Sequence, residues 1–268
     1  MEHKKYVEDK KYTYEDLLDI IDKLRGENGC PWDKIQTHTS LLPHLLEESY
    51  ELVDAINNQD MPNIKEELGD VLLQVLLHAQ IGKEYGEFTM EEVVDDLAKK
   101  LVYRHPHVFN GVNGIDTPQK VNISWEELKK HEKKEKTITE SIERIAKALP
   151  ALIRAQKIQK KGAKAGLFFE DHLPILTKIA EELEEIGIAI KNGNKIQIEE
   201  ELGEMLFSVV NLSTFFDLNP EFALTKSLEK FINRFRYVEN SAFVQGKQLA
   251  NLSLDEMNKL WEEYKIIE

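Results

Sequence analysis

The segment that decides the fold is 41–56, LLPHLLEESYELVDAI, which is followed after a short break by 64–85, IKEELGDVLLQVLLHAQIGKEY. Apolar residues recur three and four positions apart in both segments, which is the spacing of amphipathic helices. Each segment also carries carboxylates inside its apolar pattern, as Glu-Glu-x-x-Glu from Glu47 and as Glu-Leu-Gly-Asp from Glu67. Residues three and four apart share a helix face, so two such helices can direct acidic side chains to one point.

The same acidic pattern recurs 134 residues later (181 − 47 = 134), as Glu-Glu-x-x-Glu from Glu181 and Glu-Leu-Gly-Glu from Glu201. The interval between the third and fourth carboxylates is 16 residues in both copies. A repeat of this length indicates two related halves, each long enough to bury its own core. We therefore predict an all-α protein: a tandem repeat of two related helical-bundle domains over 1–136 and 149–268, joined by a linker over 137–148.

Helical spacing of apolar residues extends over most of the chain, and the alternation typical of strands is nowhere sustained. Two stretches, 110–122 and 162–171, read as loops because helical spacing is lost there. The helices expected from this pattern are 14–24, 41–56, 64–85, 90–104, 125–136, 151–161, 174–191, 198–216, 220–238 and 254–267.

Composition limits the classes of partner. The 268 residues include 35 basic and 49 acidic ones, a net charge of −14, which argues against nucleic-acid binding through a broad basic surface. Cys30 is the only cysteine, so no intrachain disulfide can form and a reducing compartment fits. No apolar run reaches the length needed to span a membrane. We expect a soluble cytoplasmic protein with neither membrane nor nucleic acid as its partner.

The clustered carboxylates are the candidate site. A Glu-rich helix is usually a solvated face, but here the acids lie within apolar helices and recur at fixed spacing. Clustering like charges costs stability unless a cation or a proton offsets them. Gly69 and Gly203 also lie inside these helices, where Gly costs about 1 kcal/mol relative to Ala. Such a glycine predicts the close approach of another helix.

Oxygen ligands without a nearby cysteine favour Mg²⁺, or Mn²⁺, over zinc. The sharpest rival is a di-iron bundle, which also builds carboxylate cages between helices but uses Glu-x-x-His pairs. None of the eight histidines has Glu or Asp three residues before it. Di-iron chemistry is therefore disfavoured.

Basic and aromatic residues repeat as well. Each half has Lys and Arg four residues apart, and then Trp-x-x-x-Lys near its end. The basic pair is either ordinary charge near a helix C-terminus or a clamp on polyphosphate opposite the metal. The Trp either covers a helix–helix contact or stacks on a nucleobase while its Lys reaches phosphate. These residues are Lys100, Arg104, Trp125 and Lys129 in the first half, and Lys230, Arg234, Trp261 and Lys265 in the second.

Further motifs accompany the acidic pattern: GCPWD at 29–33, RHPHVF at 104–109, LPAL at 149–152, RAQKIQ at 154–159, and Lys-Phe and Arg-Phe at 230–231 and 234–235. With them the chain resembles, over almost its whole length, the MazG-type nucleoside triphosphate pyrophosphohydrolases of the all-α NTP pyrophosphohydrolase superfamily. This resemblance implies Mg²⁺-dependent hydrolysis of nucleoside triphosphates to monophosphate and pyrophosphate, with little base selectivity. It also implies a homodimer of tandem helical domains.

The resemblance implies roles for individual residues. It places activity mainly in the C-terminal half, with Lys230, Arg234, Trp261 and Lys265 on the nucleotide. Two departures from the usual pattern stand in that half: Glu204 replaces an Asp, and GLFF at 166–169 replaces GFDW. The first half matches its own pattern fully. The implied metal ligands are Glu182, Glu185, Glu201 and Glu204 in the C-terminal half, and Glu48, Glu51, Glu67 and Asp70 in the N-terminal half.

The expected reaction is attack of water on the α-phosphorus, which expels magnesium pyrophosphate. Glu181 and Glu47, the first acids of each pair, lie one position from the metal set, so either could orient the attacking water. The competing class is a non-catalytic module that binds a nucleotide or a protein partner, with one or both acidic sites degenerate. Turnover with pyrophosphate release separates these two classes.

Overall fold

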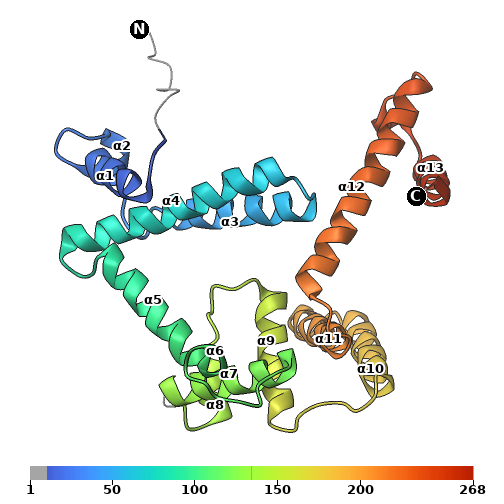
Figure 1. The fold of residues 1–268 in the computed structure, drawn as a ribbon. Coiled ribbons are helices and arrows are strands. Elements are labelled where there is room, and N and C mark those ends of the chain that lie inside the picture. Colours follow the sequence, from blue (N-terminus) through green and yellow to red (C-terminus); the bar gives the residue numbers. More distant parts are fainter. Residues whose placement is uncertain (1–10, 134, 268) are drawn as a thin grey trace. The chain divides into compact units, whose positions relative to one another are not determined.

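The computed structural model describes residues 11–133 and 135–267, and among these residues it contains helices and no strand. The chain forms two compact units, and the boundary between them in the sequence lies between Lys129 and Lys130. Figure 1 shows the helices in chain order, and each unit holds one copy of the acidic pattern. The predicted all-α class and tandem repeat are confirmed. No helix of the described residues combines the length and the apolar character needed to cross a membrane.

Unit 1 contains α1 (Tyr14–Arg25), α2 (Pro31–Lys34), α3 (Leu42–Asn57), α4 (Met61–Tyr85), α5 (Met90–Arg104), α6 (Pro106–Phe109) and most of α7 (Pro118–Lys133). Unit 2 contains α8 (Ile138–Glu143), α9 (Ala151–Lys164), α10 (Leu173–Lys191), α11 (Lys195–Phe215), α12 (Pro220–Val244), the 3₁₀ turn η1 (Leu249–Asn251) and α13 (Leu254–Ile267).

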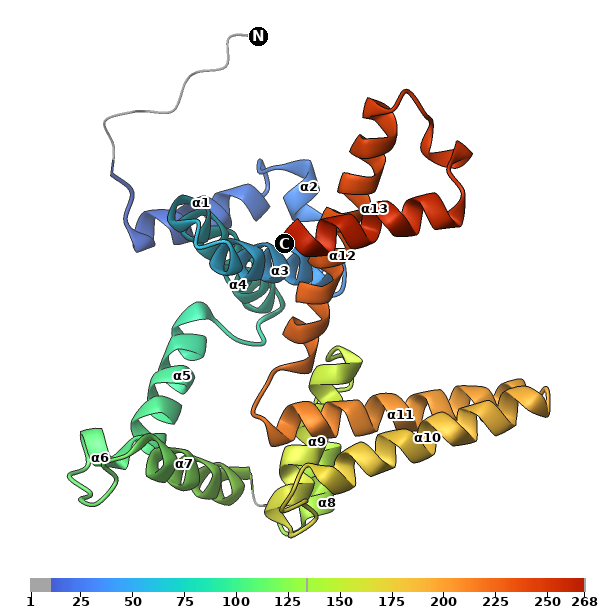
Figure 2. The ribbon, with the colours of Figure 1, turned by 90° about the vertical axis from the view of Figure 1, so that its right-hand side faces the viewer.

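The acid-bearing helices form a hairpin in each unit, α3 beside α4 and α10 beside α11 (Figures 1 and 2). Both links are short because a residue with positive φ reverses the chain, Gln59 (56°) in unit 1 and Gly193 (65°) in unit 2. The residue that follows caps the second helix: Asp60 accepts a hydrogen bond from the backbone N–H of Asn63, and Asn194 accepts one from the backbone N–H of Gln197. Such caps satisfy otherwise unpaired helix N–H groups.

Two sequence predictions about helix starts were wrong for one shared reason. Pro62 reads as a helix breaker, yet α4 begins at Met61, and α7 begins at Pro118 inside the stretch expected to be a loop. Proline fits the first turn of a helix because the N–H that it lacks has no intrahelical partner there. Thr117 marks the start of α7, since its hydroxyl accepts from the backbone N–H of Lys120.

The segment 137–148, predicted as a linker, contains α8 and packs on α9. Ser141 and Ile145 of this segment are buried, and the Lys161 ammonium on α9 donates a hydrogen bond to the Ser141 hydroxyl. This stretch therefore contributes to the packing of unit 2.

The core of unit 1 lies where α1 crosses α4, and its buried residues are Ile21, Leu41, Leu76, Leu77 and Ile81. In unit 2, α9 packs along α11 in the corresponding way. A second apolar cluster of unit 2 joins α12 to α13 through Val238, Ala242, Leu252 and Leu260.

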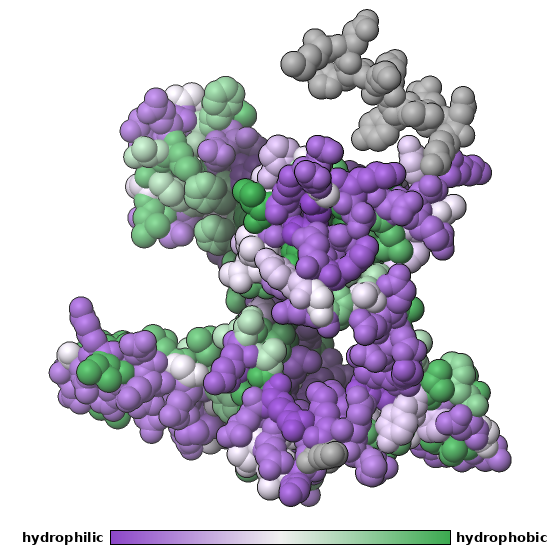
Figure 3. Space-filling view, turned by 90° about the vertical axis from the view of Figure 1, so that its left-hand side faces the viewer, coloured by the Kyte–Doolittle hydropathy of each residue, from purple (hydrophilic) through white to green (hydrophobic). Residues whose placement is uncertain are grey.

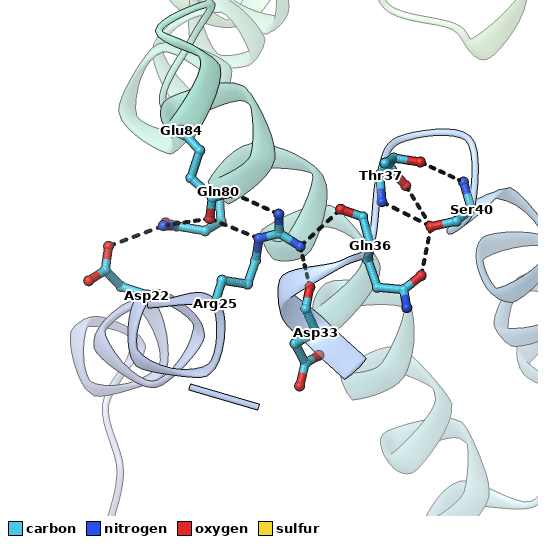
Figure 4. Close-up of polar contacts among 8 residues, drawn as sticks. All are labelled: Asp22, Arg25, Asp33, Gln36, Thr37, Ser40, Gln80 and Glu84. Carbon is cyan, nitrogen blue, oxygen red and sulfur yellow. Dashed lines mark hydrogen bonds and ion pairs between the residues drawn. The ribbon is translucent and has the colours of Figure 1, made fainter. Parts of the chain in front are cut away.

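Arg25 organises the loop that leads into the first acidic hairpin (Figure 4). Its side chain is only 4% exposed, and its guanidinium donates to both carboxylate oxygens of Glu84, at 2.8 and 2.7 Å. The same group donates to the backbone carbonyls of Asp33 and Gln36. Gly29 makes the turn possible, because an added Cβ would lie 2.2 Å from the carbonyl oxygen of Leu24.

We expect Arg25→Ala to destabilise the protein by about 2–4 kcal/mol, because it leaves buried carbonyls without donors as well as breaking an ion pair. Glu84→Gln should cost less, since the side chain of Glu84 is 35% exposed and keeps water as a partner. Urea unfolding monitored by circular dichroism measures both. Equal losses in the two variants would contradict a dominant role for the backbone carbonyls.

Candidate active site

The N-terminal acids converge between α3 and α4. Oxygens of Glu48, Glu67 and Asp70 lie within 4.8 Å of one another, which is a spacing that one metal ion could bridge. Burial raises the pKa of Glu48, and the charges of Asp70, Glu51 and Glu67 raise it further. Burial first, and then Glu51 and Asp70, raise the pKa of Glu67. Glu51 is therefore near enough to raise the pKa of both residues, although it is not one of the three acids whose oxygens lie within 4.8 Å.

The C-terminal acids form the corresponding cluster between α10 and α11. Oxygens of Glu182, Glu201 and Glu204 lie within 4.8 Å of one another. Glu182 is completely buried, at 0% exposure, whereas Glu204 is exposed. The extra methylene of Glu204, compared with Asp, therefore does not keep its carboxylate away from the cluster.

Glu185 and Lys178 complete the electrostatics of this cluster. The charge of Glu201 is the first cause that raises the pKa of Glu185, followed by burial and by Glu182. Lys178 Nζ lies 2.7 Å from Glu182 Oε1, and this interaction raises the pKa of Lys178. Glu182 Oε2 is buried and accepts no hydrogen bond from the residues that the structure describes. Sequence reasoning missed Lys178, although its position four residues before Glu182 was a usable signal.

The residues expected to orient water lie beside the clusters. Glu47 and Glu181 are exposed, and neither joins its group of three. Glu181 lies 3.7 Å from Lys178, and Glu47 lies 3.7 Å from His44, which stands at the position equivalent to Lys178 (178 − 134 = 44). The two halves therefore differ in the basic residue next to the acids.

Within the described residues, no other helix packs closely against Gly69 or Gly203 of the acidic helices. A Cβ added at Gly69 or Gly203 would meet nothing within 4 Å, so the prediction of close helix approach was wrong for these residues. Gly203 instead lines an open depression of about 600 Å³ next to Glu182 and Glu204.

Both clusters fit a hard divalent cation. They offer carboxylate oxygens alone, the donor set that Mg²⁺ and Mn²⁺ accept. A buried carboxylate oxygen without a donor, such as Oε2 of Glu182, is costly unless a cation compensates it. The residues that would hold the ion are Glu48, Glu67 and Asp70 with Glu51 nearby, and Glu182, Glu201 and Glu204 with Glu185 nearby.

The basic and aromatic residues associate with each other in both units. The Arg104 guanidinium lies over the Trp125 ring, 5.2 Å from its centroid, and Arg234 lies 5.8 Å from the centroid of Trp261. Trp261 also packs on the α12–α13 cluster. Each Trp ring thus contacts an arginine of its own unit. Lys100 and Lys230 are exposed, Lys129 is half-buried, and Lys265 pairs with Glu262.

Comparison with known proteins matches this duplicated hairpin. The family model of the MazG nucleotide pyrophosphohydrolase domain matches residues 36–109 and 170–239, one match for each acidic hairpin. The chain belongs to the MazG nucleotide pyrophosphohydrolase family. It is therefore an enzyme of a hydrolase family, and both MazG matches contain a complete acidic cluster.

Two curated relatives are similar to the chain along almost their whole length. The chain is 42% identical over 252 residues to the nucleoside triphosphate pyrophosphohydrolase/pyrophosphatase MazG of Thermotoga maritima, covering 94% of this chain and 95% of the relative. It is 38% identical over 252 residues to the nucleoside triphosphate pyrophosphohydrolase of Escherichia coli, covering 93% and 95%. An uncharacterized Bacillus subtilis protein, YabN, is 43% identical over 257 residues, which are 95% of this chain and 52% of that protein.

Proposed function

We propose that this chain is a Mg²⁺-dependent nucleoside triphosphate pyrophosphohydrolase that converts a triphosphate and water to the monophosphate and pyrophosphate. The observation that carries the proposal is the C-terminal cluster, three carboxylates within 4.8 Å of one another around the fully buried Glu182. Relatives that match nearly the whole chain carry the corresponding name. Broad base specificity is part of the proposal, because aromatic stacking discriminates weakly among bases.

The C-terminal acids Glu182, Glu185, Glu201 and Glu204 would hold Mg²⁺, or Mn²⁺ in its place, and the four acids of the N-terminal half would form a second set. A bound divalent ion lowers the pKa of coordinated water and neutralises charge on the leaving pyrophosphate. The acids of the chain itself would bind the ion and orient the attacking water. Glu181, and Glu47 in the other half, each precede a cluster acid in the sequence and are exposed, so in this proposal either accepts a hydrogen bond from the attacking water.

In the proposed step the water oxygen forms a bond to the α-phosphorus. The bond from this phosphorus to the oxygen that bridges to the β-phosphorus breaks, and pyrophosphate leaves with that oxygen. A proton from the water passes to a carboxylate of the site or to solvent. Lys230 and Arg234 stabilise the negative charge of the β- and γ-phosphates.

A homodimer is part of the proposal because the acidic hairpin of unit 2 exposes apolar side chains, including Leu183 at 60%, Leu202 and Leu206. Figure 3 shows apolar surface, in green, among the hydrophilic surface of the molecule. Exposed apolar faces of this kind mark interaction sites. Within unit 2, α12 rises away from the α10–α11 hairpin (Figures 1 and 2), so a second copy is our candidate source of the clamp formed by Lys230 and Arg234.

Hydrolysis in ¹⁸O-labelled water tests the reaction. We expect wild-type protein with Mg²⁺ to release pyrophosphate from each common nucleoside triphosphate and to place the label in the monophosphate, because water attacks the α-phosphorus. Label in the pyrophosphate would contradict attack at this atom. Nucleotide binding without any turnover would support the alternative, a non-catalytic binding module.

A further inference from the structure

Unit 2 contains a cavity of about 560 Å³ next to the acidic cluster. Segments from α8, α9, the 166–169 loop, α10 and α11 line it, and four of the lining side chains are aromatic: Phe168, Phe169, Phe207 and Phe215. The depression that contains Glu182 and Glu204 shares three lining residues with this cavity, namely Lys178, Phe207 and Ser208. The cavity therefore adjoins the depression that contains these acids.

The internal repeat shows how the two halves differ at this place. Asn211 and Phe215 line the cavity, and the positions 134 residues earlier are Leu77 and Ile81. Both of these residues belong to the buried core of unit 1, at 2% and 0% exposure. At these two positions, unit 1 therefore has buried aliphatic side chains, whereas unit 2 has an amide and an aromatic ring that line a cavity.

The polar groups of the cavity are few and distinct. Gln159 is already engaged, since its amide nitrogen donates to the carbonyl of Phe207 at 2.7 Å and its oxygen accepts from Thr214 at 3.3 Å. Asn211 also lines the cavity, and an Asn amide offers both a donor and an acceptor. Aromatic walls with one such amide match a flat heterocycle that has polar edges.

We propose that this cavity binds the base and ribose of the nucleoside triphosphate, whose phosphates then extend past Lys178 to the acids. The proposal rests on the pyrophosphohydrolase function and adds the place where the nucleoside sits. The volume lies in the usual range of ligand pockets, about 300–1,000 Å³. Stacking on Phe168 and Phe169 tolerates every base, and Asn211 adapts to different edges because its amide both donates and accepts. Trp261 is less suited to this task, since Arg234 already covers its ring.

Binding of α,β-methylene nucleoside triphosphates, measured by calorimetry with Mg²⁺, tests the cavity against pyrophosphate alone. Phe168→Ala should weaken the analogues about tenfold or more and leave pyrophosphate affinity unchanged, because only stacking is lost. Asn211→Leu, which installs the residue found at Leu77, should act in the same direction. Phe243→Ala is the matched control, since Phe243 is an exposed aromatic residue on α12 that does not line the cavity.

The outcomes separate the two levels of the proposal. If wild-type protein releases pyrophosphate but both cavity variants bind the analogues normally, the nucleoside sits elsewhere and the cavity assignment is overturned. If the variants change the monomer–dimer equilibrium in sedimentation instead of nucleotide affinity, the cavity receives a second copy and the assignment is again wrong. If wild-type protein neither hydrolyses triphosphates nor binds the analogues, it is the proposed function that fails.

Discussion

Glu182→Gln will lower pyrophosphate release by at least about 100-fold, whereas Glu48→Gln will leave most of the activity. Glu182 is fully buried, lies within 4.8 Å of Glu201 and Glu204, and adjoins a cavity large enough for a nucleoside. Glu48 holds the equivalent position in a half where aliphatic core residues fill the corresponding space. The neutral amide of Gln keeps the shape of the side chain but removes the charge on which cation binding depends.

The measurement is the initial rate of pyrophosphate release with saturating Mg²⁺. Glu184→Gln is the control, because Glu184 is an exposed acid on the same helix and belongs to neither cluster. Melting temperatures of all three variants show whether a lost rate reflects a lost fold. The opposite pattern, an inactive Glu48→Gln protein beside an active Glu182→Gln protein, would assign the chemistry to the N-terminal half.

The acidic hairpins could be predicted from sequence because each depends on a local period. The spacing within Glu47–Glu51 and Glu67–Asp70 fixes the face on which the carboxylates lie, and the repeat supplies the second copy. The structure brings three predicted ligands of each half to within 4.8 Å. The starts of helices were less predictable. A proline such as Pro62 usually indicates a helix break, but in the first turn of a helix it is well tolerated, and the sequence does not show where that turn begins.

The cavity beside the C-terminal acids could not be predicted in the same way. Asn211 and Phe168 are 43 residues apart (211 − 168 = 43) and lie on different elements, so no local period connects them. The signal that was present lay between the halves: aligned at the 134-residue offset, Leu77 becomes Asn211 and His44 becomes Lys178. An apolar core residue in one half that aligns with a polar residue in the other, such as Leu77 with Asn211, indicates a place where the packing of the two halves differs.

Without divalent cations, the melting temperature should fall as the pH rises above about 4.5. Glu48, Glu67 and Glu185 have pKa values raised above their ordinary value of 4.5, chiefly by burial and by neighbouring carboxylates. Between 4.5 and each raised pKa, the folded chain holds protons that the unfolded chain has lost. Stability therefore decreases as the pH rises through this window, and the full penalty remains above it.

His78 changes the stability with pH in the opposite direction, so the experiment needs a variant that separates its effect from that of the carboxylates. Burial and His38 lower its pKa below 6.5, so the unfolded chain takes up this proton first and acidification through that range costs stability. Glu67→Gln removes one raised carboxylate and leaves His78 unchanged. The fall in melting temperature with pH should be shallower in that variant than in wild-type protein.

Magnesium should remove most of this pH dependence, because a bound cation offsets the clustered charge that raises the pKa values. At a Mg²⁺ concentration 100 times the Kd, binding to the folded state alone adds about 2.7 kcal/mol of stability. The gain should be largest near pH 8, where the carboxylates are ionised, and small near pH 5, where protons compete with the cation. Differential scanning fluorimetry with EDTA or Mg²⁺ across this range measures both trends. If Mg²⁺ leaves the melting temperature unchanged at every pH, the carboxylate clusters do not form metal sites.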